Sequence, residues 1–130
     1  MPARINLLAA AFLAVTAPVY GQTVSGEGAG APTPALIARG DSVFHGPGNC
    51  YACHGSKGEG LVGPSLVDAE WIHIKGTAEE IAAQVAKGIP KEQSKSGIPM
   101  PPKGGSTISD DDVKAVAAYV HSLSQKKPGT

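Results

Sequence analysis

The 130-residue sequence has few of the residues that build large cores or disulfide frameworks. It contains two cysteines, one tryptophan, three tyrosines and two phenylalanines, so a multi-disulfide fold is excluded and its own apolar side chains would bury a modest core. The formal net charge is zero, and nothing suggests a surface that binds nucleic acid. The length allows one small domain, and no internal repeat divides it.

The sequence also lacks an apolar run long enough to cross a membrane. The apolar stretch near the start, Leu7 to Val15, is too short to cross a bilayer, and Pro18 interrupts its continuation. Arg4 precedes this stretch and small residues lead to Gly21, which is the layout of a secretory signal peptide. We therefore expect residues 1–21 to be removed during export, leaving no membrane span.

Both cysteines lie in one short motif, Cys50-Tyr51-Ala52-Cys53-His54. Two thiols three positions apart can add to the two vinyl groups of one haem, and the adjacent histidine can then ligate the iron. The motif predicts one covalently bound haem c held by Cys50, Cys53 and His54. This attachment needs reduced thiols outside the cytoplasm, which agrees with export, and the haem would supply apolar bulk that the composition lacks.

Three other uses of the motif are weaker. A thioredoxin-like redox pair needs a βαβ surround, whereas glycines and Pro64 follow the motif without a strand pattern. A structural zinc site needs four ligands, and the adjacent Cys53 and His54 cannot easily converge on one tetrahedral ion. A disulfide across two intervening residues would be strained and would stabilise the chain little.

Hydrophobic periodicity predicts three helices and no convincing strand, so the fold class is all-α. The first and last helices are expected to follow the N-caps Thr33 and Ser109. Between them, a helix should run from a capping box of Thr77 and Glu80 to Gly88. Long stretches rich in glycine and proline separate these helices and predict loops.

The domain boundaries follow from composition. Residues 22–32 form a small-residue, flexible linker, and residues 125–130 form a polar, disordered tail. The ordered domain is therefore expected to span residues 33–124. Within its first long loop, we expect one short helical turn over residues 66–71.

The sixth position of the iron decides between a carrier and a catalyst. Met100 lies between Pro99 and Pro101, and prolines restrict the backbone of their neighbours. A ligand on so rigid a segment loses little entropy on binding, so we expect Met100 to ligate the iron opposite His54. The alternative is that Met100 fills a gap in the core. With both axial positions filled by protein, the iron can change charge and do little else, which predicts an electron carrier and not an enzyme.

Three histidines are rival ligands: His45, His73 and His121. His45 lies just before the motif, on the wrong side of the chain for the far face of the haem. His121 is expected at a solvated position on the last helix. His73, between two isoleucines, is the strongest rival.

These residues resemble those of small bacterial monohaem class I c-type cytochromes over about residues 33–124. The resemblance rests on the C-x-x-C-H motif, on Met100 before a proline, and on Gly40 and Phe44, which would face Val116 and Tyr119. It implies the cytochrome c fold, with three to five helices wrapped around one covalently attached haem. The first and last helices would cross near Gly40.

The resemblance also implies two further haem-binding residues. The carbonyl of Pro64 would support His54, and Trp71 would lie near a haem propionate. An ordinary core position is the alternative for Trp71.

Together these features predict a periplasmic, monomeric carrier that moves single electrons between a dehydrogenase or quinol-oxidising complex and a terminal acceptor. The alternatives are a dedicated electron-accepting subunit of one dehydrogenase, and an open-iron haem enzyme or gas sensor. Redox proteins are the expected partners, with an acidic docking patch that meets four lysines near Met100: Lys87, Lys91, Lys95 and Lys103. These lysines could equally serve solubility alone.

Overall fold

The computed structural model describes residues 31–126. The expected signal peptide at residues 1–21, nearly all of the linker at 22–32 and the end of the tail at 127–130 lie outside this range. The described part contains four α-helices, two short 3-10 helices and no strand, which confirms the all-α class. None of these helices has the length and apolar character needed to cross a membrane.

The first helix, α1 (Pro34–His45), begins as its sequence predicts. The hydroxyl of Thr33 accepts a hydrogen bond from the Leu36 amide at 3.3 Å, and Pro34 occupies the first helical position, where a missing N–H costs nothing. The buried face consists of Gly40, Val43 and Phe44.

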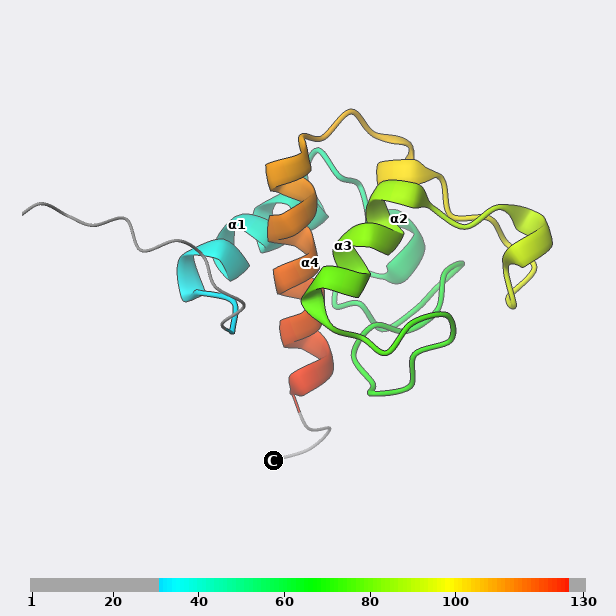
Figure 1. Ribbon diagram of the computed structural model, residues 1–130, viewed down its shortest axis with the longest axis horizontal. Helices are drawn as coiled ribbons and strands as arrows, with labels where there is room; N and C mark the ends of the chain where they lie inside the picture. Colours follow the sequence, from blue (N-terminus) through cyan, green and yellow to red (C-terminus); the bar gives the residue numbers. More distant parts are fainter. Residues whose placement is uncertain (1–30, 127–130) are drawn as a thin grey trace, which may run out of the picture.

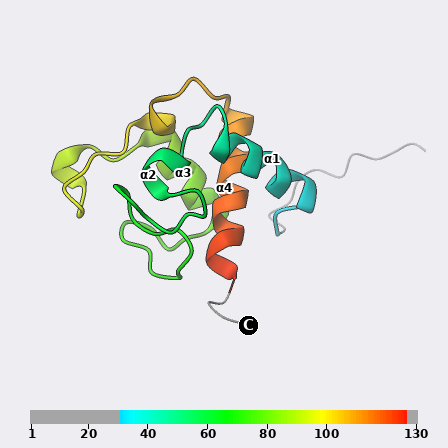
Figure 2. The same cartoon turned by 180° about the vertical axis from the view of Figure 1, so that it is seen from behind.

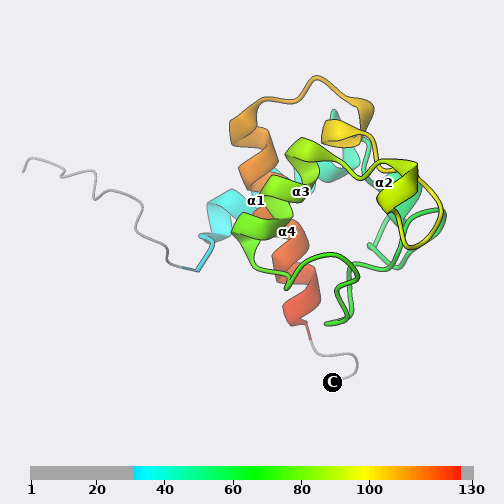
Figure 3. The same ribbon diagram turned by 45° about the vertical axis from the view of Figure 1, so that its right-hand side comes forward.

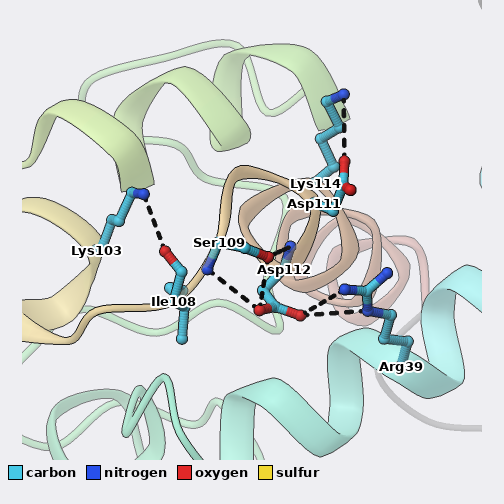
Figure 4. Close-up of polar contacts among 7 residues, drawn as sticks. All are labelled: Arg39, Lys103, Ile108, Ser109, Asp111, Asp112 and Lys114. Carbon is cyan, nitrogen blue, oxygen red and sulfur yellow. Dashed lines mark hydrogen bonds and ion pairs between the residues drawn. The ribbon is translucent and has the colours of Figure 1, made fainter.

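The two other long helices both begin with a capping box. In α3 (Ala78–Lys87) the box joins Thr77 and Glu80, and Gly88 ends the helix with a φ of 72°. In α4 (Asp110–Gln125) the Ser109 hydroxyl accepts from the Asp112 amide at 3.1 Å, and the Asp112 carboxylate accepts from Ser109, as Figure 4 shows. Both predicted helices are confirmed, and α4 extends one residue beyond the expected domain end.

The helices α1 and α3 both pack against α4, and the three together form a helical frame. Figure 1 shows α1 running across α4, while α3 lies along a different side of it, and Figure 2 shows the same arrangement from behind. Their contact surfaces form the core, which has nine members: Val43, Phe44, Ile81, Val85, Ile108, Val113, Val116, Ala117 and Val120. Of these, only Phe44 is aromatic, so the core is modest, as the composition predicts.

Gly40 is the point at which α1 and α4 approach most closely. A Cβ atom there would collide with the backbone carbonyl of Ala115 and would lie 2.7 Å from the Cβ of Tyr119. Next to this contact, the rings of Phe44 and Tyr119 pack edge to face with centroids 5.3 Å apart. The crossing of the first and last helices near Gly40, which the resemblance implies, is confirmed.

Two local predictions differ from the structure. Residues Tyr51–His54 form a short helix, α2, in addition to the three helices predicted from the sequence. Four residues are too few for hydrophobic periodicity to reveal a helix. The helical turn expected over residues 66–71 is wrong, because other groups occupy the backbone amides. The Leu66 amide donates to the Gly58 carbonyl at 2.7 Å, and the Glu70 amide donates to the Asp68 carboxylate at 3.1 Å.

The segment between α3 and α4 contains η1 (Lys91–Gln93) and η2 (Pro102–Gly105). An isolated antiparallel bridge joins Ile89 to Met100 and closes the segment into a loop. Figure 3 shows this loop and the loop that follows α2 extending on the same side of α3, away from α1. The helical frame therefore leaves its loops together on one face.

The crossing of α1 and α4 gives the first prediction. Substitution Gly40→Ala adds one methyl group against backbone that cannot rotate away, so we expect the free energy of unfolding to fall by about 1–3 kcal/mol. Thermal unfolding followed by circular dichroism measures this change. Ala38→Val, on the exposed face of the same helix, is the control and should change stability by no more than about 0.5 kcal/mol. An equal loss in both variants would contradict the assigned contact.

Candidate functional site

An apolar cavity of about 160 Å³ opens on the loop face of the molecule. Its walls come from α2, from the loop after α2 and from the segment around Met100. A second, smaller hollow of about 70 Å³ lies against core residues of α1, α3 and α4. Three residues line both spaces: Cys50, His54 and Met100. The residues that sequence analysis selects therefore come together at one site.

The backbone before α2 places the two cysteines. Asn49 adopts a left-handed conformation with a φ of 52°, and the Cys50 amide donates to the Phe44 carbonyl at 3.1 Å. This turn brings Cys50 to a half-buried position in the cavity wall, while Cys53 is exposed. Both thiols are free, so the pair does not form a disulfide.

The environment of Cys50 disfavours thiolate chemistry. Burial, with a smaller contribution from Cys53, raises the pKa of the Cys50 thiol to about 11. Disulfide exchange needs the thiolate, so the raised pKa disfavours this use of Cys50 near neutral pH. Among the residues described, no three His, Cys, Asp or Glu side chains group as a metal site.

His54 is oriented by the loop that follows it. Its Nδ1 atom lies 2.9 Å from the carbonyl oxygen of Pro64, which can only accept a hydrogen bond. A neutral imidazole with its proton on Nδ1 has its lone pair on Nε2, which is then available to a metal. The Gly63 amide anchors this loop by donating to the Cys53 carbonyl at 2.8 Å.

Gly63 forms a cradle for the imidazole of His54. A Cβ atom at Gly63 would lie 2.9 Å from the Cε1 atom of the ring and 3.0 Å from Nδ1. Glycine therefore allows the loop to pass directly against the histidine. Sequence analysis assigned no role to Gly63, because a glycine in a loop gives no sign of which side chain it meets.

Met100 is held through its backbone. Its amide donates to the Ile89 carbonyl at 2.9 Å, and its carbonyl accepts from the Ile89 amide at 2.8 Å. Gly88 lies so close that a Cβ atom there would be 2.5 Å from the Met100 carbonyl oxygen. Gln84 supports this corner from α3, since its side-chain amide donates to the Gly88 carbonyl at 2.8 Å.

The donor set and the cavity fit a covalently held haem. The two spaces are lined by the imidazoles of His54 and His73, by Met100 and by the two cysteines, in a mostly apolar enclosure. These are the groups that could supply two axial ligands and two thioether bonds to one macrocycle. Such a centre can exchange single electrons, and the apolar walls would limit access of water to it.

Trp71 lines the smaller hollow, packed against the core. Its indole covers Gly76 so closely that any side chain there would collide with Nε1. Trp71 is absent from the lining of the outer cavity. Its proximity to a propionate stays a prediction, and its packing is that of a partly buried core residue.

The three rival histidines lie in different environments. The Nδ1 atom of His121 lies 2.9 Å from the Gly76 carbonyl, so this half-buried residue is not simply solvated as expected. His45 lies with Nε2 2.7 Å from the Ser56 carbonyl and Nδ1 2.9 Å from the Asp41 carboxylate. His73 is exposed and lines the outer cavity, so it stays the strongest rival of Met100.

Two of the four lysines near Met100 make contacts within the chain. The ammonium group of Lys95 donates to the Ile72 carbonyl at 2.9 Å. The ammonium group of Lys103 donates to the Ile108 carbonyl and to the Asp110 carboxylate, both at 2.9 Å. Lys87, Lys91 and Lys95 are exposed, whereas Lys103 is partly buried, so a docking role for these lysines stays a prediction.

The surroundings of His45 give a prediction about pH. The carbonyls of Ser56 and Asp41, followed by the Asp41 carboxylate, raise the pKa of His45 above its usual 6.5. Only the imidazolium can donate from both ring nitrogens to these acceptors. Its stabilising contribution should be complete below about pH 6.5 and should be lost as pH rises through the raised pKa.

We therefore expect His45→Gln to lower the thermal unfolding midpoint at about pH 5 and to match the wild type more closely at about pH 9. Asp41→Asn should give a smaller effect in the same direction, because both backbone carbonyls remain. A difference between wild type and His45→Gln that is the same at both pH values would contradict this assignment.

Comparison with known proteins identifies the domain. The family described as cytochrome c oxidase, cbb3-type, subunit III matches residues 35–120. The subunit CcoP of the cbb3-type cytochrome c oxidase of Rubrivivax gelatinosus is 36% identical over 110 residues, which cover 83% of this chain and 33% of that protein. The corresponding subunit FixP of Azorhizobium caulinodans is 34% identical over 99 residues, covering 75% of this chain and 33% of that protein. The chain thus spans about a third of the length of these relatives.

Among solved structures, cytochrome CL from Methylophaga aminisulfidivorans has a similar fold. The TM-score is 0.57 at 23% identity, over 77% of this chain and 63% of that one. This likeness confirms the predicted cytochrome c fold. A cytochrome c domain implies haem c as cofactor and electron transfer as the class of function. The chain belongs to the family described as cytochrome c oxidase, cbb3-type, subunit III.

Proposed function

We propose that this domain carries single electrons through one haem c in the periplasm, with Cys50 and Cys53 as attachment points and His54 and Met100 as axial ligands. The donor would be a dehydrogenase or quinol-oxidising complex, and the acceptor a terminal oxidase. In this proposal the chain catalyses no reaction of its own.

The observation that carries the proposal is the placement of Met100. Two backbone hydrogen bonds to Ile89 fix Met100 in the wall of the cavity that His54 also lines. Pro99 and Pro101 on either side restrict the backbone further. A thioether held in this way is available as a ligand with little further loss of entropy.

The chemistry expected of the site follows from its donors. A thioether ligand opposite histidine favours ferrous iron and raises the reduction potential relative to two histidines. The chain's own residues orient these donors: the Pro64 carbonyl fixes the tautomer of His54, and Ile89 holds the Met100 backbone. Because both axial positions would be filled from the protein, small ligands would be excluded.

Substitution Met100→Ala tests the axial ligand. We expect the ferric protein to lose the weak long-wavelength absorption band that arises from sulfur-to-iron charge transfer. We also expect carbon monoxide to bind the ferrous variant much faster than the ferrous wild type, because one axial position is then open. Absorption spectroscopy and stopped-flow mixing measure the two effects.

Ile98→Ala is the matched control, since Ile98 lines the same cavity from the same segment, is 43% exposed and offers no donor atom. It should keep the band and the slow reaction with carbon monoxide. If the wild type lacks the band, Met100 is not the ligand. If the wild type binds carbon monoxide as fast as Met100→Ala, the iron is open and the carrier proposal fails. Covalent attachment of the haem is tested separately by extraction with an acidic solvent. The haem should stay with the wild-type protein and be lost from a Cys50→Ser/Cys53→Ser variant.

A second candidate is permanent membership of one oxidase complex. The observation that favours it is that the relatives compared above are named as subunits of cbb3-type cytochrome c oxidases. Three exposed apolar side chains that line the cavity could meet a partner: Val62, Ile72 and Ile98.

The two candidates differ in how a partner is held. A shuttle should leave its partner when salt is raised to about 0.5 M, because steering between charges is screened within a few ångströms. A permanent subunit should stay bound, because apolar contacts are not weakened by salt. Co-purification of the tagged chain from native membranes at low and high salt separates the two outcomes.

A further inference from the structure

Lys103 lies three residues after Met100, beyond Pro101 and Pro102. Its backbone is left-handed, with a φ of 53° and a ψ of 29°, and the two glycines that follow are also left-handed. A left-handed backbone is unfavourable for a residue with a side chain, and glycine is the usual choice. A lysine at this position therefore needs a compensating contact.

That contact is made by the ammonium group. Lys103 Nζ donates to the Ile108 carbonyl at 2.9 Å, and Figure 4 shows this bond reaching the chain just before α4. The side chain is 29% exposed, and Ile108 itself belongs to the core. A charge-assisted bond to a carbonyl in such a place is stronger than one in open water.

Asp110 provides the second acceptor. Its carboxylate lies 2.9 Å from Lys103 Nζ, and this hydrogen bond lowers the pKa of the Asp110 carboxyl. The Asp110 side chain is 87% exposed, so this pair alone would stabilise the chain little. The bond to the Ile108 carbonyl is the more important of the two.

The backbone of Lys103 is tied into the same turn. Its carbonyl accepts from the hydroxyl of Ser106 at 2.6 Å and from the Ser106 amide at 3.1 Å. The Gly104 amide donates to the Pro101 carbonyl at 3.0 Å. Hydrogen bonds therefore connect the turn over residues 101–106 on both sides of Lys103.

The chain from Met100 to Lys103 is thus anchored at both of its ends, next to two different helices. The bridge to Ile89 ties Met100 to the end of α3, and Lys103 ties the chain after it to the start of α4. Because α3 and α4 pack against each other, both anchors rest on one frame. Removal of one anchor would let the segment between them move away from the cavity.

We propose that Lys103 is a positioning residue that holds Met100 at the iron by fastening the Met100 segment to the start of α4. The inference rests on the proposed ligation by Met100. In this role the Lys103 ammonium group contacts the chain itself, whereas the sequence predicted a contact with a partner protein.

The test measures how readily an outside ligand displaces Met100. Imidazole is titrated into the ferric, haem-loaded protein, and its dissociation constant is read from the absorption spectrum. Lys103→Met keeps the aliphatic stem and removes the ammonium group. We expect it to bind imidazole about three- to tenfold more tightly than the wild type, the range for loss of a partly exposed, charge-assisted hydrogen bond.

Two variants serve as comparisons. Lys103→Arg keeps a cationic donor and should return the affinity most of the way to that of the wild type. Lys114→Met removes a solvent-exposed lysine whose pair with Asp111 is 3.7 Å long and, in Figure 4, lies away from Lys103. It should bind imidazole as the wild type does. Thermal unfolding of each variant shows whether a change in affinity is merely a loss of stability.

Met100→Ala separates failure of this inference from failure of the proposed function. If Met100→Ala binds imidazole strongly while Lys103→Met behaves as the wild type, Met100 is a ligand and Lys103 does not position it. If Met100→Ala binds no more tightly than the wild type, the proposed ligation itself is wrong. An equal gain in Lys103→Met and Lys114→Met would overturn the inference by showing a general effect of charge.

Discussion

The antiparallel pairing of Ile89 with Met100 is the constraint on which the site depends. Two hydrogen bonds fix the one internal thioether of the described chain in the wall of an apolar cavity, and Gly88 makes room for that pairing. His54 reaches the same cavity from α2, oriented by the Pro64 carbonyl. Each candidate ligand is therefore held by backbone groups of loops that rest on the helical frame.

The helical frame explains how so small a core can support irregular loops. The crossing at Gly40 brings α1 and α4 into backbone contact, and α3 packs on α4 beside it. The loops then gather on one face, around a hollow that the chain's few aromatic residues do not fill. A macrocycle in that hollow would bury apolar surface that the chain alone leaves open, so cofactor binding and stability should be coupled.

Features encoded by residues close in sequence were predictable. The capping box of Thr77 and Glu80 predicts the start of α3, and the C-x-x-C-H motif predicts the cofactor, because both patterns depend on residue spacing within one helical turn. The expected helical turn over residues 66–71 failed because Asp68 and the Gly58 carbonyl take its amides. Contacts outside the helices were not predictable, since neither the bridge between Ile89 and Met100 nor the bond from Lys103 to the Ile108 carbonyl follows a periodic sequence pattern.

The central claim is an iron coordinated by one imidazole nitrogen and one thioether sulfur in addition to the macrocycle. X-ray absorption at the iron K-edge of the mature ferric protein tests it most directly, because the first coordination sphere distinguishes sulfur from lighter atoms. The account predicts one sulfur scatterer together with nitrogen scatterers. A first sphere without sulfur, whether filled by a second histidine or by water, would contradict it.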